Sequence, residues 1–317
     1  MAELITLGET MVLLKPFHGG GRLKSSQVLS KSIGGAESNV AIGVSRLGHE
    51  SAWISKVGRD PFGEEILYTL NAERVDTRYV SLSDAPTGIM FKERIRDEDS
   101  RVYYYRERSA ASTLQVDDVR EDMIRGAKLL HLTGITPALS ASCRDVVTHA
   151  MSLAKRNSVR ISFDPNLRLK LWSAEEARAT LLPMAREADF FFPGLDEARL
   201  LLNRPEADAD EVLDRFLDMG IPTIVLKLGP SGCIYATSEN RITVPGFKVT
   251  EIDSVGAGDG FCAGFLTGYL EGWEPAKCAE LANAVGALAV TAVGDYEALP
   301  TMEEVEQFLG KRSSIAR

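Results

Sequence analysis

The residues best suited to chemistry lie in one stretch near the C-terminus, Asp253-Ser-Val-Gly-Ala-Gly-Asp-Gly-Phe-Cys-Ala-Gly264. The pattern predicts a strand over Phe247–Ile252 before it and an apolar helix after it, running toward Leu270. The small residues of Gly256-Ala-Gly258 stand where this helix should begin. The first N–H groups of a helix have no backbone partner and lie at the positive end of its dipole. Because glycine lets a ligand approach the backbone closely, the stretch predicts an anion site suited to phosphate.

Asp259 comes next, and its negative charge would repel a phosphate held at the same place. A site made only for binding would favour Ser, Thr or Lys at this position. A carboxylate fits instead if it accepts a proton from a hydroxyl group that attacks the phosphate. The alternative is that Asp259 is an ordinary first-turn residue, chosen because its charge suits the helix dipole.

The composition narrows the class of protein. The chain has 317 residues, of which 44% are hydrophobic, enough for one large or two smaller domains and too many for a disordered chain. The formal net charge of −9 argues against nucleic acid or an anionic membrane as the main partner. An acidic protein that binds anions must gather positive charge locally, so single Arg and Lys residues near glycines become candidates.

The cysteines and the N-terminus favour a cytoplasmic protein. The four cysteines form no C-x-x-C pair and no disulfide framework, and the four histidines are too scattered to predict a zinc site. The first residues lack the basic and apolar regions of a signal peptide. No apolar run approaches the ~18 residues of a membrane span, so we expect the cytoplasm as the location and no membrane partner.

The chain alternates between helix-like and strand-like segments. The expected helices are Val116–Gly126, Ala141–Arg156, Ala174–Glu187, Asp210–Met219 and one that begins at Pro61; the expected strands are Leu4–Gly8, Ala52–Val57, Lys128–Leu132, Val159–Phe163, Asp189–Phe192 and Thr223–Lys227, with an antiparallel pair at Gly232–Thr237 and Arg241–Val244. Such alternation predicts right-handed crossovers and an α/β fold whose central, mainly parallel sheet has helices on both faces.

A second glycine-rich stretch lies nearer the N-terminus. Gly34-Gly-Ala-Glu-Ser-Asn39 leads into a predicted helix, Val40–Leu47, which Gly48 ends. Asn is a mediocre helix former, so Asn39 just inside a helix indicates a ligand contact. The alternative for the glycines is a tight loop.

Two segments of the N-terminal third predict a small separate β-sheet. Thr10–Ser32 reads as strands and turns, and Gly88–Arg96 with Arg101–Arg106 predicts a hairpin with a polar turn at Asp97–Ser100. Its three consecutive tyrosines, Tyr103–Tyr105, cannot all face one side of a strand. We expect this sheet to form a lid inserted into the larger domain.

Ligands of parallel sheets bind beside the C-terminal ends of the strands, which makes polar residues at those ends candidates. Arg168 follows one predicted strand and Arg106 ends the lid hairpin, and such a pair suits a carboxylate or phosphate. Lys227, before Gly229, would lie near the phosphates of a nucleotide. The alternatives are surface charge for the two arginines and a plain turn for the segment after Lys227.

Two motifs resemble a known family. The stretch around Asp259 resembles the D-T-x-G-A-G-D signature of the ribokinase-like (PfkB) carbohydrate kinases, with Ser254 in place of the usual Thr, and IGGAESNVAIGVSRLG resembles their N-terminal signature. The likeness covers nearly the whole chain. It implies one kinase domain over residues 1–317, with a three-layer ribokinase-like fold and a small β-sheet lid formed by roughly residues 10–33 and 87–107.

The same resemblance implies roles for the signature residues. Asp259 would be the catalytic base, and the backbone of Gly256, Ala257 and Gly258 would form the anion hole. The cofactors would be ATP and Mg²⁺, with Glu197 linked to the magnesium through water. Family membership also allows a monovalent cation such as K⁺.

Three further segments, RVYYYRERSAASTL, LHLTGITPALS and SFDPNLRLKLW, resemble one subgroup, the 2-keto-3-deoxygluconate kinases. This likeness implies that ATP phosphorylates the terminal (C6) hydroxyl of 2-dehydro-3-deoxy-D-gluconate. The residues that it implies at the sugar acid are Gly35, Asn39, Tyr104, Arg106, Arg168 and Asp295. Those that it implies at the nucleotide are Asn166, Lys227, Gly229, Gly232, Gly256, Gly258 and Asn283.

Some positions depart from the family pattern. Kinases of neutral sugars in the family usually carry an Asp five residues after the glycine that ends the first strand, where this chain has Leu13. An Asp there would repel a substrate carboxylate, whereas the two arginines would attract it. The N-x-x-E element linked to magnesium reads Gly194-Leu-Asp-Glu197, so the Asn is lost. Met90 replaces a Tyr that contacts the sugar in some relatives.

Other interpretations remain open. The chain would phosphorylate fructose, ribose or 5-dehydro-2-deoxygluconate if the substrate assignment is wrong. A sugar-binding module without catalysis is disfavoured by the intact Asp259, and a nicotinamide dehydrogenase by the missing G-x-G-x-x-G. A second copy of the chain is an expected partner through the lid, because an exposed strand edge tends to pair.

Overall fold

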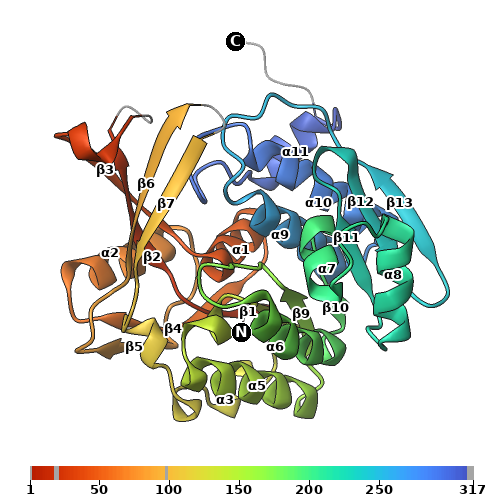
Figure 1. Ribbon diagram of the computed structural model, residues 1–317, viewed down its shortest axis with the longest axis horizontal. Helices are drawn as coiled ribbons and strands as arrows, with labels where there is room; N and C mark the ends of the chain where they lie inside the picture. Colours follow the sequence, from red (N-terminus) through yellow and green to blue (C-terminus); the bar gives the residue numbers. More distant parts are fainter. Residues whose placement is uncertain (1, 18–20, 97–98, 313–317) are drawn as a thin grey trace.

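The computed structural model describes residues 2–17, 21–96 and 99–312, and within them a nine-stranded sheet forms the centre of the molecule (Figure 1). Its strands are β1 (Leu4–Leu7), β4 (Ser51–Gly58), β5 (Val80–Ser83), β8 (Leu129–Thr133), β9 (Arg160–Asp164), β10 (Phe190–Phe191), β11 (Ile224–Lys227), β12 (Gly232–Ala236) and β13 (Arg241–Pro245). Their order across the sheet is β13-β12-β11-β10-β9-β8-β1-β4-β5. The neighbours from β5 to β11 pair in parallel, and β12 and β13 add an antiparallel edge.

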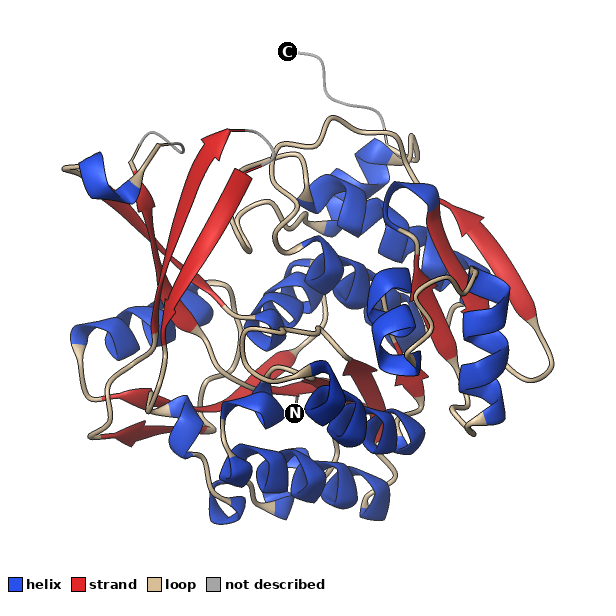
Figure 2. Cartoon of the chain, viewed as in Figure 1, coloured by secondary structure: helices blue, strands red, loops and turns tan. Residues whose placement is uncertain are grey.

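Helices cover both faces of this sheet, as Figure 2 shows. One face carries α3 (Glu121–Ile124), α5 (Ala141–Arg156), α6 (Ala174–Glu187), α7 (Leu195–Leu202) and α8 (Ala209–Asp218), with α4 (Thr136–Leu139) leading into α5. The other carries α1 (Ala36–Arg46), α2 (Pro61–Ala72), α9 (Ala257–Leu270) and α10 (Pro275–Ala289), and α11 (Met302–Phe308) packs on α10. The short 3₁₀ turns are Leu23–Ser25, Ala111–Thr113, Val116–Asp118 and Gly229–Ser231.

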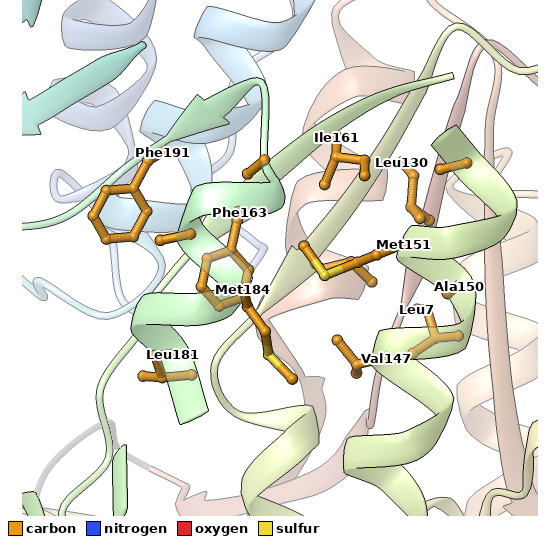
Figure 3. Packing of buried hydrophobic residues seen from close by; sticks show 14 of the residues in the cluster. Leu7, Leu130, Val147, Ala150, Met151, Ile161, Phe163, Leu181, Met184 and Phe191 are labelled. Atoms are coloured by element: carbon orange, nitrogen blue, oxygen red, sulfur yellow. The ribbon is translucent and has the colours of Figure 1, made fainter. Parts of the chain in front are cut away.

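The two faces are packed by alternate residues of the same strands. Leu129 packs toward α1 and α9, whereas its neighbour Leu130 packs toward α5. Phe191 and Phe192 divide between the two faces in the same way, because successive side chains of a strand point to opposite sides. Figure 3 shows the first of these cores, where Phe163 lies beside Met184 of α6. The central strands are therefore buried and mostly apolar on both faces, as strands of a covered parallel sheet are.

The predicted lid is a separate sheet of four strands within the described residues, at the upper left of Figure 1. Its strands are β2 (Met11–Pro16), β3 (Leu29–Gly34), β6 (Ile89–Arg96) and β7 (Asp99–Tyr105), in the order β3-β2-β6-β7. Tyr104 packs on an inner cluster with Met11, Leu13 and Met90, whereas Tyr103 and Tyr105 lie on the opposite, exposed face. The tyrosines therefore divide between the two faces, as strand geometry requires.

Most predicted elements are confirmed, several to within one residue, and a few are wrong. No strand forms over Phe247–Ile252: within this described stretch the chain leaves edge strand β13, and Ile252 donates its N–H to the Val290 carbonyl at the end of α10 instead. The helix expected over Val116–Gly126 is broken, because Val119 is extended between a 3₁₀ turn and α3.

Two smaller differences concern element boundaries. α1 begins at Ala36 rather than Val40, so the glycine pair ends directly at the helix. β10 has only two residues, since Pro193 follows shortly and has no N–H to donate. Part of the turn predicted at Asp97–Ser100 lies outside the described residues. Among the described helices, none combines the length and the apolar character that crossing a bilayer requires.

Candidate active site

A cavity of about 380 Å³ lies between the lid and the C-terminal ends of the sheet strands. The lid contributes its inner face, and the sheet contributes the residues that follow β1, β8, β9 and β11. Its lining includes Glu9, Leu13, Gly35, Asn39, Met90, Lys92, Tyr104, Arg106, Asp164, Asn166, Arg168, Glu197, Lys227, Gly256, Gly258, Asp259 and Asp295. All six residues predicted at the sugar acid therefore face one cavity, together with Asp259 and two of the three predicted anion-hole residues.

The start of α9 is shaped by one glycine. Gly256 is the N-cap residue and has a φ of +79°, in the left-handed region that favours glycine. A Cβ atom at this position would also collide with the carbonyl oxygen of Asp295. The helical hydrogen bonds begin with Gly260, whose N–H donates to the Gly256 carbonyl at 2.8 Å. The N–H groups of Gly258 and Asp259 come before this first helical hydrogen bond. They lie at the positive end of the helix, where an anion is stabilised.

Two helices pack closely enough to hold the Asp259 carboxylate. A Cβ atom on Gly43 of α1 would crowd the Ala263 side chain of α9, so this glycine permits the close approach. Asn39 lies one turn before Gly43, and Asp259 one turn before Ala263, on the facing sides. The Asn39 Nδ2 accordingly donates to Oδ2 of Asp259 at 2.8 Å.

Asp259 is buried, and this environment changes its proton affinity. Burial raises its pKa to about 7, a rise that the hydrogen bond from Asn39 and the charge of Arg168 limit, and that the charges of Asp164 and Asp295 increase. Its Oδ1 lies 3.4 Å from the Asn166 Nδ2. A carboxylate that takes up a proton near neutral pH, and is held in place on both sides, is suited to general base catalysis.

Asp295 is the second buried acid of the cavity, next to the glycine pair at the start of α1. A Cβ atom on Gly34 would collide with its carboxylate, so the backbone approaches it closely. Burial raises the pKa of Asp295 to about 6, and the charge of Lys92 opposes that rise. A carboxylate at this place can accept hydrogen bonds from the hydroxyl groups of a sugar.

The two predicted arginines differ in their surroundings. Arg106 is buried and donates from Nε to Oε2 of Glu9 at 2.7 Å, and its guanidinium lies over the Tyr104 ring with its Cζ 5.6 Å from the ring centre. Glu9 therefore positions Arg106 and offsets its charge. Arg168 is exposed at the cavity mouth and, within the described part of the chain, has no ion-pair partner. It is the better placed of the two to attract an anionic ligand.

A second, partly buried ion pair lies beside the start of α9. Lys227 places its Nζ 2.7 Å from Oδ2 of Asp164. Burial by itself would lower the pKa of Lys227, but Asp164 and its acidic neighbours outweigh this effect and raise it. The lysine therefore stays charged beside the place where a phosphate would meet α9.

Glu197 has a structural role that its sequence did not reveal. Its Oε2 accepts the Gly194 N–H at 2.8 Å, which caps α7, and its Oε1 accepts the Leu167 N–H at 2.7 Å. Burial raises its pKa. Each oxygen keeps one lone pair, which could accept a hydrogen bond from a water molecule bound to a divalent cation. Within the described residues, no group of three or more Asp, Glu, His or Cys side chains is arranged so that it could hold a metal ion.

A second cavity of about 610 Å³ adjoins the first on the other side of α9. Both are lined by Lys227, Ser254 and Gly258, so they meet at the helix start. The predicted nucleotide residues Lys227, Gly229, Gly232, Gly258 and Asn283 line it, and the rest of its wall includes Phe247, Val249, Ala287 and Val290. A largely apolar pocket next to an anion site suits a nucleotide base and its phosphates.

Two predicted nucleotide residues lie elsewhere. Asn166 and Gly256 line the first cavity and not the second. Asn166 lines the first cavity because its backbone, with a φ of +35°, turns the side chain toward Asp259 rather than across α9. Asn283 lines the second cavity and donates to the carbonyls of Val244 and Pro245, both at 3.1 Å.

Sequence reasoning missed several residues of the site. Glu9 directly follows the first strand and its glycine, so the strand-end rule could have found it. Asp164 lies in a segment that the same rule singles out, but nothing in the sequence pairs it with Lys227. Lys92, which forms a buried ion pair with Asp253, gives no signal at all, since a lone lysine in a strand normally faces solvent.

The comparisons with known proteins agree with this geometry. The model of the pfkB family of carbohydrate kinases matches residues 1–302. The chain is 39% identical over 317 residues to the 2-dehydro-3-deoxygluconokinase of Bacillus subtilis, covering 99% of this chain and 97% of the relative. It is 35% identical to the enzyme of that name from Thermoproteus tenax, covering 98% and 94%. It is 31% identical to fructokinase-2 of rice (Oryza sativa), covering 98% and 95%.

Solved structures give the same result for the fold. The crystal structure of the 2-dehydro-3-deoxygluconokinase of Thermotoga maritima matches with a TM-score of 0.90 at 26% identity, covering 98% of this chain and all of that one. The fructokinase of Vibrio cholerae, solved with fructose, ADP and a calcium ion, matches with a TM-score of 0.87 at 29% identity, covering 98% and 99%. The predicted ribokinase-like α/β fold with its lid is therefore confirmed.

The buried charge of Asp259 predicts how stability depends on pH. An unfolded Asp loses its proton near pH 3.8, whereas the folded pKa is raised to about 7, mainly by burial. Below pH 3.8 the protonated carboxyl therefore makes its full contribution to the stability of the folded state. This contribution is lost as the pH rises through 7. Asn at this position cannot titrate. We expect the melting temperature of Asp259→Asn, minus that of the wild type, to rise between pH 4 and pH 8.

Thermal unfolding of the ligand-free protein at a series of pH values measures this difference. It should correspond to a few kcal/mol at most, since about 1.4 kcal/mol accompanies each pKa unit. Asp84→Asn is the control, because the Asp84 side chain is fully exposed at 100%. A difference for Asp259→Asn that stays constant with pH would contradict the account.

Proposed function

Because the chain belongs to the PfkB family of carbohydrate kinases, we propose that it transfers the γ-phosphoryl group of ATP to the C6 hydroxyl of 2-dehydro-3-deoxy-D-gluconate. The observation that carries the proposal is Asp259 at the start of α9, where the two cavities meet. One cavity holds the residues expected at the sugar acid and the other most of those expected at the nucleotide. Residues 1–317 would work as one kinase domain with the lid over the sugar.

The wall of the first cavity supports a sugar acid. Leu13 is buried on the inner face of the lid, so this position carries no negative charge to repel a carboxylate. Arg168 and, to a lesser degree, the Glu9-paired Arg106 supply positive charge. Asp295, Asn39 and the Gly35 backbone line the same cavity, where they would bind the hydroxyl groups of the sugar. Relatives named 2-dehydro-3-deoxygluconokinase at 39% and 35% identity favour the same substrate.

The chemical step follows from the position of Asp259. Its carboxylate accepts the proton of the C6 hydroxyl, whose oxygen forms a bond to the γ-phosphorus. The bond from that phosphorus to the oxygen shared with the β-phosphate breaks, and ADP leaves. The N–H groups of Gly258 and Asp259 donate to the oxygens of the transferred group, where negative charge is stabilised, whereas the N–H of Ala257 donates to the Ser254 carbonyl at 3.4 Å. Asn39 and Asn166 hold the base in place.

The nucleotide would occupy the second cavity with its phosphates toward Gly258 and Lys227. A divalent cation, Mg²⁺ in our proposal, would neutralise phosphate charge when bound, and Glu197 would hold it through water. A relative solved with ADP and a calcium ion supports a divalent cation in general. A monovalent cation such as K⁺ and the cytoplasmic location remain predictions.

A kinase of a neutral sugar is the second candidate, since fructokinase-2 of rice covers the chain at 31% identity. Leu13 and Arg168 argue against it. Leu13 offers a sugar hydroxyl no hydrogen bond, and an uncharged sugar offers Arg168 no ion pair. Production of ADP, measured with a coupled assay across a panel of sugars and sugar acids, distinguishes the two. Highest kcat/KM on 2-dehydro-3-deoxygluconate supports the proposal, and highest kcat/KM on fructose or ribose would refute it.

Removing the base should stop turnover without removing the nucleotide. We expect Asp259→Asn to lower kcat by ~10²–10⁴, the usual loss when a general base is removed. The Kd of ATP, measured by calorimetry, should stay close to that of the wild type. Asp84→Asn is the control for a surface charge. Near-normal turnover in Asp259→Asn would mean that another group takes the proton.

The charge of the cavity wall should decide between acidic and neutral sugars. Leu13→Asp and Leu13→Asn have nearly the same shape and differ in charge. We expect the Asp variant to have a kcat/KM on the sugar acid that is lower than that of the Asn variant by on the order of tenfold to a hundredfold, from charge repulsion at short range. For neutral sugars the two variants should be equal. An equal loss of both variants on the sugar acid would show that charge at this position is irrelevant.

We also propose that two copies of the chain associate through their lids. The outer lid face exposes Leu29, Tyr103 and Tyr105, which are 36%, 42% and 68% exposed, and the sheet ends in open edges. Light scattering should give twice the mass of 34.6 kDa, and Tyr105→Ser should shift the protein toward the monomer. Tyr68→Ser, at a tyrosine of α2 that is 78% exposed, should leave the dimer intact. A monomeric wild type at micromolar concentration contradicts the proposal.

A further inference from the structure

One buried ion pair joins the lid to the segment that leads into α9. Lys92 lies on lid strand β6, and its Nζ is 2.6 Å from Oδ2 of Asp253, a residue 161 positions away. The two side chains are only 6% and 5% exposed. The contact is therefore shielded from water, unlike the surface ion pairs of the chain, whose charges are screened.

Asp253 uses its other oxygen to shape the turn before the helix. Its Oδ1 accepts the Val255 N–H at 3.3 Å, and its own N–H donates to the Val290 carbonyl at 3.2 Å. Ser254, Val255 and Gly256 then line the sugar cavity, and α9 begins at Ala257. One carboxylate thus holds the turn with one oxygen and the lid lysine with the other.

The charge of Lys92 also matters for a phosphate. Asp253 and Asp295 are both buried near the start of α9, and Gly256 packs directly on the Asp295 carbonyl. Without a cation between them, the two carboxylates would repel an anion at the helix start. Lys92 lines the sugar cavity and supplies that cation from the lid.

We propose that Lys92 is a positioning residue that couples the lid to the anion site. Its ammonium group fixes residues 253–256, so that the N–H groups at the start of α9 are set for phosphoryl transfer while the lid covers the sugar cavity. The role rests on the proposed sugar kinase function. It differs from that of Arg168, because the Lys92 ammonium is directed to a carboxylate of the protein rather than to the ligand.

The main test is Lys92→Met, assayed with whichever sugar of the panel the wild type phosphorylates. We expect kcat to fall by about 10²-fold, as a small misplacement of reacting groups can cause, while the KM of the sugar changes little. ADP formation without sugar should change less than ADP formation with sugar, so the stimulation by sugar shrinks. Lys92→Arg, which keeps the cation, should recover most of the loss.

Lys15→Met is the matched control. Lys15 is also a lid lysine, and its Nζ lies 3.7 Å from Oε1 of Glu297, which is in the same C-terminal region but outside residues 253–256. Its loss should change kcat by no more than a few-fold, in line with the small energies of partly exposed pairs. An equal loss in both variants would overturn the proposal, since any lid contact would then have the same effect.

A double-mutant cycle separates positioning from a contact with the sugar. If Lys92 acts through Asp253, the effects of Lys92→Met and Asp253→Asn on ln kcat are not additive. Additive effects, or a raised KM with unchanged kcat, would overturn the proposal and make Lys92 a substrate contact. If Lys92→Met does not fold, the variant that carries both substitutions is used in its place, because it leaves no unpaired buried charge. Its kcat is then compared with that of Asp253→Asn. A preferred sugar other than 2-dehydro-3-deoxygluconate refutes the substrate assignment and leaves this test intact.

Discussion

Asp259 stands in the first turn of α9, where the helix dipole would stabilise its charge, yet burial raises its pKa to about 7. The two effects oppose each other, and the burial dominates because α1 packs against α9 through Gly43. That packing brings the Asn39 amide to the carboxylate. The proposed base, its hydrogen-bond donor and the proposed anion site thus depend on one close helix contact. The rest of the site is arranged around this position.

The cavity charges are organised mainly as pairs. Arg106 is paired with Glu9, Lys227 with Asp164 and Lys92 with Asp253. In each pair the carboxylate fixes the position of the cation and compensates for part of its lost hydration. Arg168 stands outside this scheme at the cavity mouth. A ligand carboxylate there would complete a fourth pair, which gives a physical reason for a sugar acid as the substrate.

The sequence predicted much of the fold because the signals were local. Alternating apolar segments predicted the sheet and its two helix layers, and the glycines before Asp259 predicted the start of α9. Most residues named for the sugar and the nucleotide line two adjoining cavities. What failed depends on distant partners: the stretch Phe247–Ile252 looks like a strand but has no neighbouring strand in the described residues. The pair of Lys92 with Asp253 spans 161 positions, and no spacing rule could reveal it.

The most direct test of the central claim is a crystal structure of the chain with ADP, Mg²⁺, aluminium fluoride and the preferred sugar. Aluminium fluoride stands in for the phosphoryl group during transfer. The account predicts that it lies against the N–H groups of Gly258 and Asp259, with the accepting hydroxyl within hydrogen-bond distance of the Asp259 carboxylate. A fluoride complex bound away from the start of α9, or an Asp259 side chain turned from the hydroxyl, would contradict it.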